Sequence, residues 1–391
     1  MMSSSIGITM VTGFSQTFFR RQVVTSYRFN NNNVQRSFFT KNLLLLLYRQ
    51  QRHYATTTTT IGTSTFALAD TNNTDTDTDT MKVRTYNGNI IILERGTNHL
   101  VVAKPASVLC HHSDWAGSKQ KSSKKKKKTS KKDDDHDRLL RRPPEIPMLQ
   151  RVRNALGERV NVIHRLDRGC SGCLLFTWSK SHNDLVNATT VLSDALADDS
   201  SIKTYVALVR GEGILHGRDF TKEGWFEVTR PIKDEKGELK NATTYFRFLA
   251  GQDSLSDPNR PRASLVLARP KTGRWHQIRR HLNGLSHPIL GDSSHGNSKT
   301  NREWKDRGMP AERTCLHLAR LQITANEACP DGIDVSCPLP KDMMDLLEKY
   351  LPNVLKEATP VLLEENIQLV ESDESQQPTV LPYTIHLREY H

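Results

Sequence analysis

The first 69 residues of this 391-residue chain contain no aspartate or glutamate, although they hold seven arginines and lysines. They are instead rich in serine, threonine and asparagine, which is typical of organelle transit peptides. We therefore expect residues 1–69 to be a disordered mitochondrial transit peptide. Plastid import, or a disordered tail with no address, are the alternatives. Residues 70–85 repeat threonine and aspartate and are expected to be a low-complexity linker.

Long apolar runs are also lacking. The longest, Leu43–Leu47, is far shorter than the roughly 18 residues that a spanning helix needs, so we expect no membrane partner. The six cysteines lack the dense spacing of a secreted scaffold, which favours a reducing compartment. Cys170 and Cys173 form half of a zinc or redox motif, but no second such pair exists. A structural role is therefore the better interpretation, and we expect no metal.

The net charge of +12 is concentrated in two places, residues 1–69 and the nine lysines between Lys119 and Lys132. Without them the chain has no net positive charge, so attraction for RNA must come from local patches. Residues 116–138 are interpreted as an insertion, either a flexible arm that grips RNA phosphates or a solvated loop. Residues 351–391 are expected to form an acidic C-terminal extension.

From Ile90 onward, short runs rich in β-branched and aromatic residues alternate with turn-forming residues, which predicts many strands. Strands outnumber helices and do not alternate with them strictly. This pattern favours an α+β domain with a mixed or antiparallel sheet. The expected strands are 90–93, 99–103, 172–176, 204–210, 226–230, 243–249, 264–268 and 315–325, and the expected helices are 146–156, 181–196, 276–283 and 341–350.

Asp167 is the first candidate for chemistry. It lies between Arg165 and Arg168, just before an apolar strand, in the segment 161–180. Neighbouring guanidinium groups favour the charged carboxylate, and a charged carboxylate suits nucleophilic or general-base work. From these residues alone, a structural Asp–Arg pair is the stronger explanation.

A second candidate is the basic segment 260–281, which holds seven arginines and lysines, two histidines and Trp275. No acid occurs between Pro258 and Gly291. Residues 272–274 are predicted to form a turn, and a helix is expected to begin at His276. Uninterrupted positive charge on a strand, a turn and a helix predicts RNA contact rather than an ordinary solvated face.

Several ordered motifs resemble the RluA-type pseudouridine synthases: HRLDRGCSG, KTYVALVRG, RPKTGRWHQIRRHL and HPILGDSSHGN, preceded by HLVVAKPASVLCHHS. The resemblance covers residues 86–350. It implies a pseudouridine synthase fold, with a mixed, mainly antiparallel curved sheet flanked by helices, and an isomerase without a cofactor. Within the family the motifs are most similar to bacterial synthases that act on uridine 65 of tRNA. RNA, and tRNA first, is then the expected partner of a monomer with no obligate protein partner.

The resemblance also assigns roles to individual residues. It makes Asp167 the catalytic carboxylate, Tyr205 the tyrosine that stacks on the uracil, and Arg279 the buried arginine that pairs with the aspartate. By residue type alone, Tyr205 is better explained as a core aromatic. Arg165 would fill the gap left by the flipped uridine, and Ile278 would pack beneath the base. The other expected substrate-binding residues are His164, Arg168, Arg274, His276 and Gln277.

Two alternatives to a tRNA enzyme stay open. The same chemistry could act on ribosomal or messenger RNA, because these motifs do not specify the substrate. The chain could instead be a catalytically inert RNA-binding protein, which the loss of Asp167 or Tyr205 would have favoured. Cys170 departs from the threonine usual in the family, but we expect it to preserve the turn. Whether the carboxylate attacks ribose C1′ or uracil C6, or removes a ribose proton, is open at this level.

Overall fold

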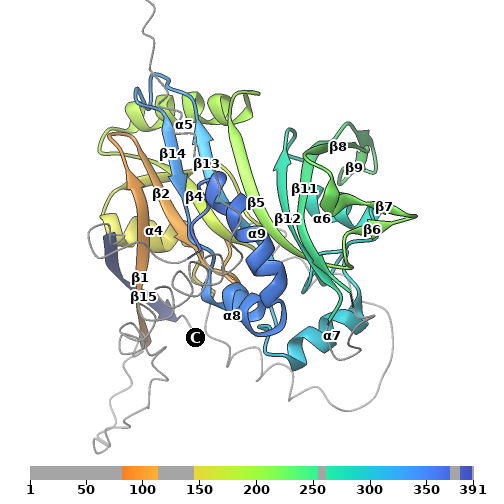
Figure 1. The fold of residues 1–391 in the computed structure, drawn as a ribbon. Coiled ribbons are helices and arrows are strands. Elements are labelled where there is room, and N and C mark those ends of the chain that lie inside the picture. The colour runs from red at the N-terminus through yellow and green to blue at the C-terminus, as the bar shows by residue number, and fades with distance from the viewer. Residues whose placement is uncertain (1–81, 113–144, 254–260, 370–378, 390–391) are drawn as a thin grey trace, which may run out of the picture. The chain divides into compact units, whose positions relative to one another are not determined.

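The computed structural model describes residues 82–112, 145–253, 261–369 and 379–389 (Figure 1). The expected transit peptide 1–69, most of the linker 70–85 and the Lys-rich insertion 116–138 lie outside these residues. Within them, no helix is long and apolar enough to cross a membrane.

The strands are β1 (Lys82–Arg95), β2 (His99–Lys104), β3 (Arg159–Val162), β4 (Ser171–Ser179), β5 (Ile202–Arg210), β6 (Ile214–Leu215), β7 (Arg218–Asp219), β8 (Phe226–Thr229), β9 (Ile232–Lys233), β10 (Leu239–Lys240), β11 (Thr243–Gln252), β12 (Ala263–Pro270), β13 (Leu316–Ile323), β14 (Ile333–Ser336) and β15 (Thr379–Glu389). The helices are α4 (Met148–Leu156), α5 (His182–Ala197), α6 (Gln277–Gly284), α7 (Ser298–Asp306), α8 (Lys341–Tyr350) and α9 (Pro352–Glu364), with a 3-10 turn at Phe220–Lys222.

One large sheet organises the described residues. Its strands run in the order β15-β1-β2-β4-β13-β5-β12-β11-β8, with β3 paired to β4 and β14 paired to β13. Within this sheet only β4 and β13 pair in parallel, and the other neighbours are antiparallel. Helix α5 packs on β4, and α9 packs on β11. The expected α+β class with a mixed, mainly antiparallel sheet and flanking helices is confirmed.

The apolar pattern of each strand explains its place in the sheet. β4, β5 and β12 each contain an uninterrupted apolar run whose residues are all buried, namely 173–176, 205–209 and 265–268. Such continuous runs are typical of strands covered on both faces. β11 alternates strictly between buried and partly buried residues, so it packs one face on the core. The core therefore lies along the central strands, which also carry the segments that lead into the candidate site.

The structure adds elements that the sequence pattern did not predict: β3, β14, α7, the hairpins β6–β7 and β9–β10, and everything after Tyr350. Most of these are short and polar, so their stability comes from tertiary pairing rather than from local pattern. In the expected extension 351–391, α9 packs on β11, and β15 pairs with β1 from Lys82 to Ile92. β1 also begins before residue 86, the expected start of the catalytic domain.

Gly172 allows the parallel contact between β4 and β13. Its φ is +119°, and a Cβ atom at this position would collide with the backbone of Leu318. Leu318 is its register partner on β13. Only glycine fits such a close approach at such a dihedral angle. Because β4 follows directly after the loop that holds Asp167, this contact also fixes where that loop ends.

We expect Gly172→Ala to lower the free energy of unfolding by at least about 2 kcal/mol, because the left-handed dihedral and the collision both penalise a side chain. Urea unfolding followed by circular dichroism measures the change. Gly224→Ala is the matched control, since an added Cβ there has no neighbour within 4 Å. Equal stability of the two variants would contradict this account of Gly172.

Candidate active site

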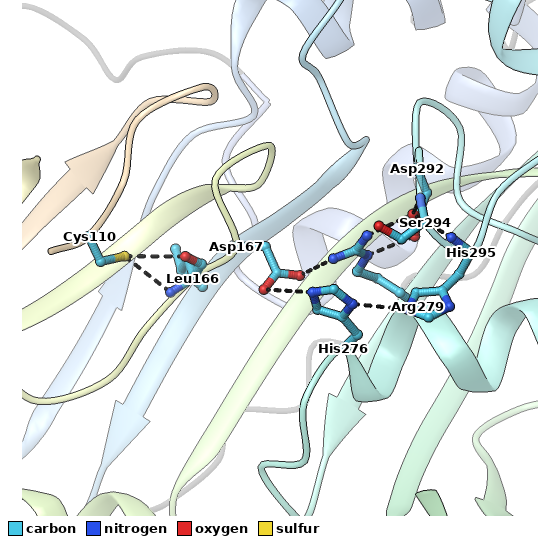
Figure 2. Close-up of polar contacts among 8 residues, drawn as sticks. All are labelled: Cys110, Leu166, Asp167, His276, Arg279, Asp292, Ser294 and His295. Carbon is cyan, nitrogen blue, oxygen red and sulfur yellow. Dashed lines mark hydrogen bonds and ion pairs between the residues drawn. The ribbon is translucent and has the colours of Figure 1, made fainter. Parts of the chain in front are cut away.

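Asp167 lies in the loop between β3 and β4, and the backbone on both sides of it is fixed. The buried ammonium group of Lys104 donates to the carbonyl oxygens of Arg168 (3.2 Å) and Cys170 (2.7 Å). On the other side, the Cys110 sulfur lies 3.3 Å from both the backbone nitrogen and the carbonyl oxygen of Leu166 (Figure 2). The loop therefore presents the Asp167 side chain from a backbone with little freedom to move.

Lys104 is an unusual anchor because its charge is buried, with 1% of the residue exposed. Burial lowers its pKa from 10.5 to about 8. Its partners are backbone carbonyls, including that of Pro105 at 2.9 Å. At neutral pH the ammonium form therefore predominates, and two of its three hydrogen bonds hold the Asp167 loop.

Arg279, on α6, connects Asp167 to a second carboxylate (Figure 2). Its Nη1 donates to Asp167 Oδ2 at 2.7 Å, while Nε and Nη2 donate to the two oxygens of Asp292, each at 2.7 Å. Burial works to lower the pKa of Arg279, but the hydrogen bonds and charges of both carboxylates raise it above its ordinary value. The guanidinium is a permanent cation that holds one oxygen of Asp167 in place.

Asp292 was not among the residues expected from the sequence. It is 1% exposed, and its carboxylate also accepts hydrogen bonds from the backbone nitrogens of Ser294 and His295, both at 2.9 Å. Its sequence position did carry a signal, because it is the first acid after the acid-free stretch 258–291. A buried cation needs a counter-charge, so the acid that ends such a stretch is a natural candidate.

His276 approaches the other oxygen of Asp167. Its Nε2 lies 3.8 Å from Asp167 Oδ1, and its Nδ1 is hydrogen-bonded to His295 Nε2 at 2.9 Å. Burial lowers the pKa of His276 to about 4, so the ring is neutral at physiological pH. The residue has left-handed backbone angles (φ 54°), uncommon outside glycine and a frequent mark of functional sites. The Trp275 indole stacks on its ring, with centroids 4.1 Å apart.

Tyr205 lies in β5, opposite Ala268 on β12 and Leu318 on β13. The residue is 9% exposed and belongs to the hydrophobic core. Burial, with a smaller effect from the Asp167 carboxylate, raises the pKa of the phenol above its ordinary value. The hydroxyl therefore stays protonated, as both the core interpretation and the expected active-site role require.

The remaining expected site residues differ in what they contact. Arg165 is exposed, and Arg274 is exposed with its Nε donating to the Asn241 carbonyl at 3.0 Å. Arg168 is half-exposed and lies 3.3 Å from a Glu145 carboxylate oxygen and 3.4 Å from one of Glu312.

Three of the expected residues are held by the fold itself. The imidazole of His164 accepts a hydrogen bond from the Leu175 backbone nitrogen at 3.2 Å, and burial lowers its pKa to about 4. Gln277 is buried and donates to the Thr243 carbonyl at 2.8 Å, while accepting from the Arg274 backbone nitrogen at 3.0 Å. Ile278 is 6% exposed and packs in the core.

The geometry offers a carboxylate but little else that reacts. Burial raises the pKa of the Cys170 thiol to about 12, and that of Cys173 well above its ordinary value, so neither thiol is ionised. Among the described residues, no group of three or more His, Cys, Asp or Glu side chains is placed to hold a metal ion. The Asp167 carboxylate, which is 35% exposed and bound to Arg279 through one oxygen, is the accessible ionisable group at this point of the site.

The sequence matches a family model described as RNA pseudouridylate synthase over residues 98–284. Similar curated proteins include the tRNA pseudouridine synthase C of Pasteurella multocida, 33% identical over 208 residues that cover 52% of this chain and 82% of the relative. The protein of the same name from Vibrio parahaemolyticus is 33% identical over 184 residues, covering 45% and 71%. That from Pectobacterium carotovorum is 32% identical over 238 residues, covering 58% of this chain and 53% of the relative, about half its length.

Two solved human structures are also similar. The RNA Pseudouridylate Synthase Domain Containing 4 structure is 19% identical with a TM-score of 0.44, and it covers 67% of this chain and 92% of its own. The Domain Containing 1 structure is 21% identical with a TM-score of 0.42, covering 64% and 84%.

Asp292 generates a prediction about stability and pH. Removing one partner of a buried ion pair costs about 3–5 kcal/mol, and we expect Asp292→Asn to cost about 3 kcal/mol at pH 7, because Asp167 still balances Arg279. Burial works to raise the pKa of Asp292, but Arg279 and two backbone N–H groups lower it below its ordinary 3.8. The stabilisation is therefore present above pH 3.8 and lost as the pH falls below it.

Unfolding of the wild-type protein and of Asp292→Asn in guanidinium chloride, at pH 7 and at about pH 3, tests this expectation. The difference between their free energies of unfolding should be large at pH 7 and smaller at pH 3. Asp334→Asn is the control, since this half-exposed carboxylate pairs with Arg320 at the surface, where such a pair contributes less than about 1 kcal/mol. A loss that is the same at both pH values would contradict the assignment.

Proposed function

The chain belongs to the RNA pseudouridylate synthase family, and from this we propose that it converts a uridine of tRNA to pseudouridine, with Asp167 as the catalytic carboxylate. One observation supports this role of Asp167, the asymmetry of its carboxylate. Oδ2 is held by Arg279 at 2.7 Å, while Oδ1 faces His276 at 3.8 Å, beyond hydrogen-bond distance. One oxygen is thus oriented and the other is free to react.

The reaction needs an oriented carboxylate and a flipped base. Isomerisation breaks the bond between ribose C1′ and N1, turns the uracil and joins C1′ to C5, while a proton leaves C5 and N1 gains one. A free carboxylate oxygen suits either attack on the nucleoside or removal of a ribose proton. The exposed Arg165, two residues before Asp167, suits the gap left by the flipped nucleotide. Tyr205, to which the resemblance assigns stacking on the uracil, belongs to the core beneath the site and keeps a protonated phenol.

The proposed substrate rests on the relatives. The curated relatives described above carry the name tRNA pseudouridine synthase C. We place the target at uridine 65 because HPILGDSSHGN and the motifs before it resemble the bacterial synthases that act there. Ribosomal or messenger RNA is the competing substrate.

We expect Asp167→Asn to reduce pseudouridine formation by about 10⁴-fold or more, because the amide keeps the shape of the side chain but cannot supply its charge. RNA binding should change little. Purified full-length protein is mixed with RNA carrying tritium at uracil C5, and tritium release and the modified position are measured. Asp306→Asn, at an exposed carboxylate on α7, is the control.

Release from tRNA by the wild-type protein, absent with Asp167→Asn, supports the proposal and identifies the uridine. Release from ribosomal or messenger RNA alone would replace the substrate while keeping the chemistry. No release from any RNA, with binding intact, would leave an inert RNA-binding protein. Full turnover by the Asp167→Asn variant would show that another group is the catalyst.

We also propose that residues 1–69 direct the protein to the mitochondrion. The support is their composition, seven basic residues without a single acid. A fusion of residues 1–69 to a fluorescent protein should coincide with a mitochondrial marker. The same fusion with its arginines changed to glutamine should stay in the cytosol. Accumulation of the first fusion in plastids, or a diffuse signal, would contradict the assignment.

A further inference from the structure

A surface hollow lies next to the candidate active site. It has a volume of about 460 Å³ and is lined on one side by Gly273, Arg274 and Trp275, in the turn before α6. The other side is the β9–β10 hairpin, residues 232–240. Arg280 connects the two sides, because its Nη1 donates to the Lys233 carbonyl at 2.8 Å and its guanidinium carbon lies 5.3 Å from the centre of the Trp275 ring.

Trp275 is the distinctive residue of this hollow. It is 46% exposed, and it is the only aromatic among the large hydrophobic side chains exposed within the described parts of the chain. Its indole stacks on His276, whose Nε2 lies 3.8 Å from Asp167 Oδ1. A single imidazole ring therefore separates the exposed indole from the proposed catalytic carboxylate.

The hollow is lined by four cations and three carboxylates, so its net charge is slightly positive. Lys233, Lys236 and Arg274 line it, and none has an ion-pair partner among the described residues. Two of its acidic side chains already have hydrogen-bond or ion-pair partners. Asp234 accepts from two backbone N–H groups at 2.9 Å each, and Glu238 pairs with Lys240 at 2.7 Å. Asp234 and Glu235 keep their negative charges, so the three cations without an ion pair outnumber the two acids outside the Lys240–Glu238 pair.

We propose that this hollow holds a nucleotide adjacent to the target uridine in the RNA chain, with its base stacked on Trp275 and its phosphates near Lys233, Lys236 and Arg274. The proposal rests on the proposed function, because it takes the target to be at Asp167. Flipping a uridine leaves its neighbours without a stacking partner, and an exposed indole replaces that partner. An exposed aromatic ring beside cations is the usual platform on which the bases of single-stranded nucleic acid stack.

Binding is the first test, since it does not require turnover. All proteins carry Asp167→Asn, so that the RNA stays unmodified, and the probe is a synthetic tRNA arm that contains uridine 65. Stacking on an aromatic side chain contributes about 1–3 kcal/mol, so Trp275→Ala should weaken binding about 5- to 150-fold. Trp275→Phe, which keeps a ring, should recover most of that loss. Leu363→Ala, at a 56% exposed residue of α9, should leave binding unchanged.

The RNA offers a second, independent change. Removing the base on one side of the uridine should weaken binding by the parent protein. If the removed base is the one that contacts Trp275, removing it from the RNA should weaken binding by the Trp275→Ala variant little further. If the removed base lies several nucleotides away, the losses of binding free energy from base removal and from Trp275→Ala should add.

Unchanged affinity of Trp275→Ala, or additive losses at both neighbouring positions, would overturn the proposal. So would a phenylalanine variant as weak as the alanine variant. A failure of the proposed function looks different: tritium release would be absent with the wild-type protein, whatever the binding measurements show.

Discussion

The arrangement of Asp167, Arg279 and Asp292 is the constraint on which the rest of the site depends. Arg279 is 6% exposed and carries a permanent charge, and such a charge is tolerated in a protein interior only when it is balanced. Two carboxylates balance it, and they come from segments far apart in the chain. The loop before β4, helix α6 and the loop after residue 291 must therefore meet for the cation to be buried at all.

A second buried cation, Lys104, supports Asp167 in a different way. Lys104 donates to backbone carbonyls rather than to carboxylates, so it fixes the path of the chain around Asp167 instead of the side chain itself. Arg279 holds the side chain through one oxygen. The two cations restrict different degrees of freedom of one residue, and Asp167 keeps one oxygen unbound and accessible.

Much of the central sheet could be predicted from the sequence, because β4, β5 and β12 each contain an uninterrupted apolar run. The strands β3 and β14 could not, since each is only four residues long, and neither could β15, whose partner β1 begins the described residues. In the site, Asp167 and Arg279 are 112 positions apart, so only the family resemblance brought them together. Residue type alone also does not show whether a histidine or glutamine contacts RNA or is bonded to the backbone. The side chains of His164 and Gln277 are bonded to the backbone. Asp292 was missed although its place at the end of the acid-free stretch 258–291 was visible in the sequence.

The pairing of β1 with β15 bears on how the protein is made. Thr85 and His386, joined by a side-chain hydrogen bond across these strands, are 301 positions apart. β15 can pair with β1 only once residues 379–389 have been made, so every shorter form of the chain lacks the strand that ends the sheet. An uncovered edge strand presents free N–H and C=O groups that can pair with other chains. Without β15, β1 would be that edge strand, so loss of residues 379–389 moves the open edge of the sheet from β15 to β1.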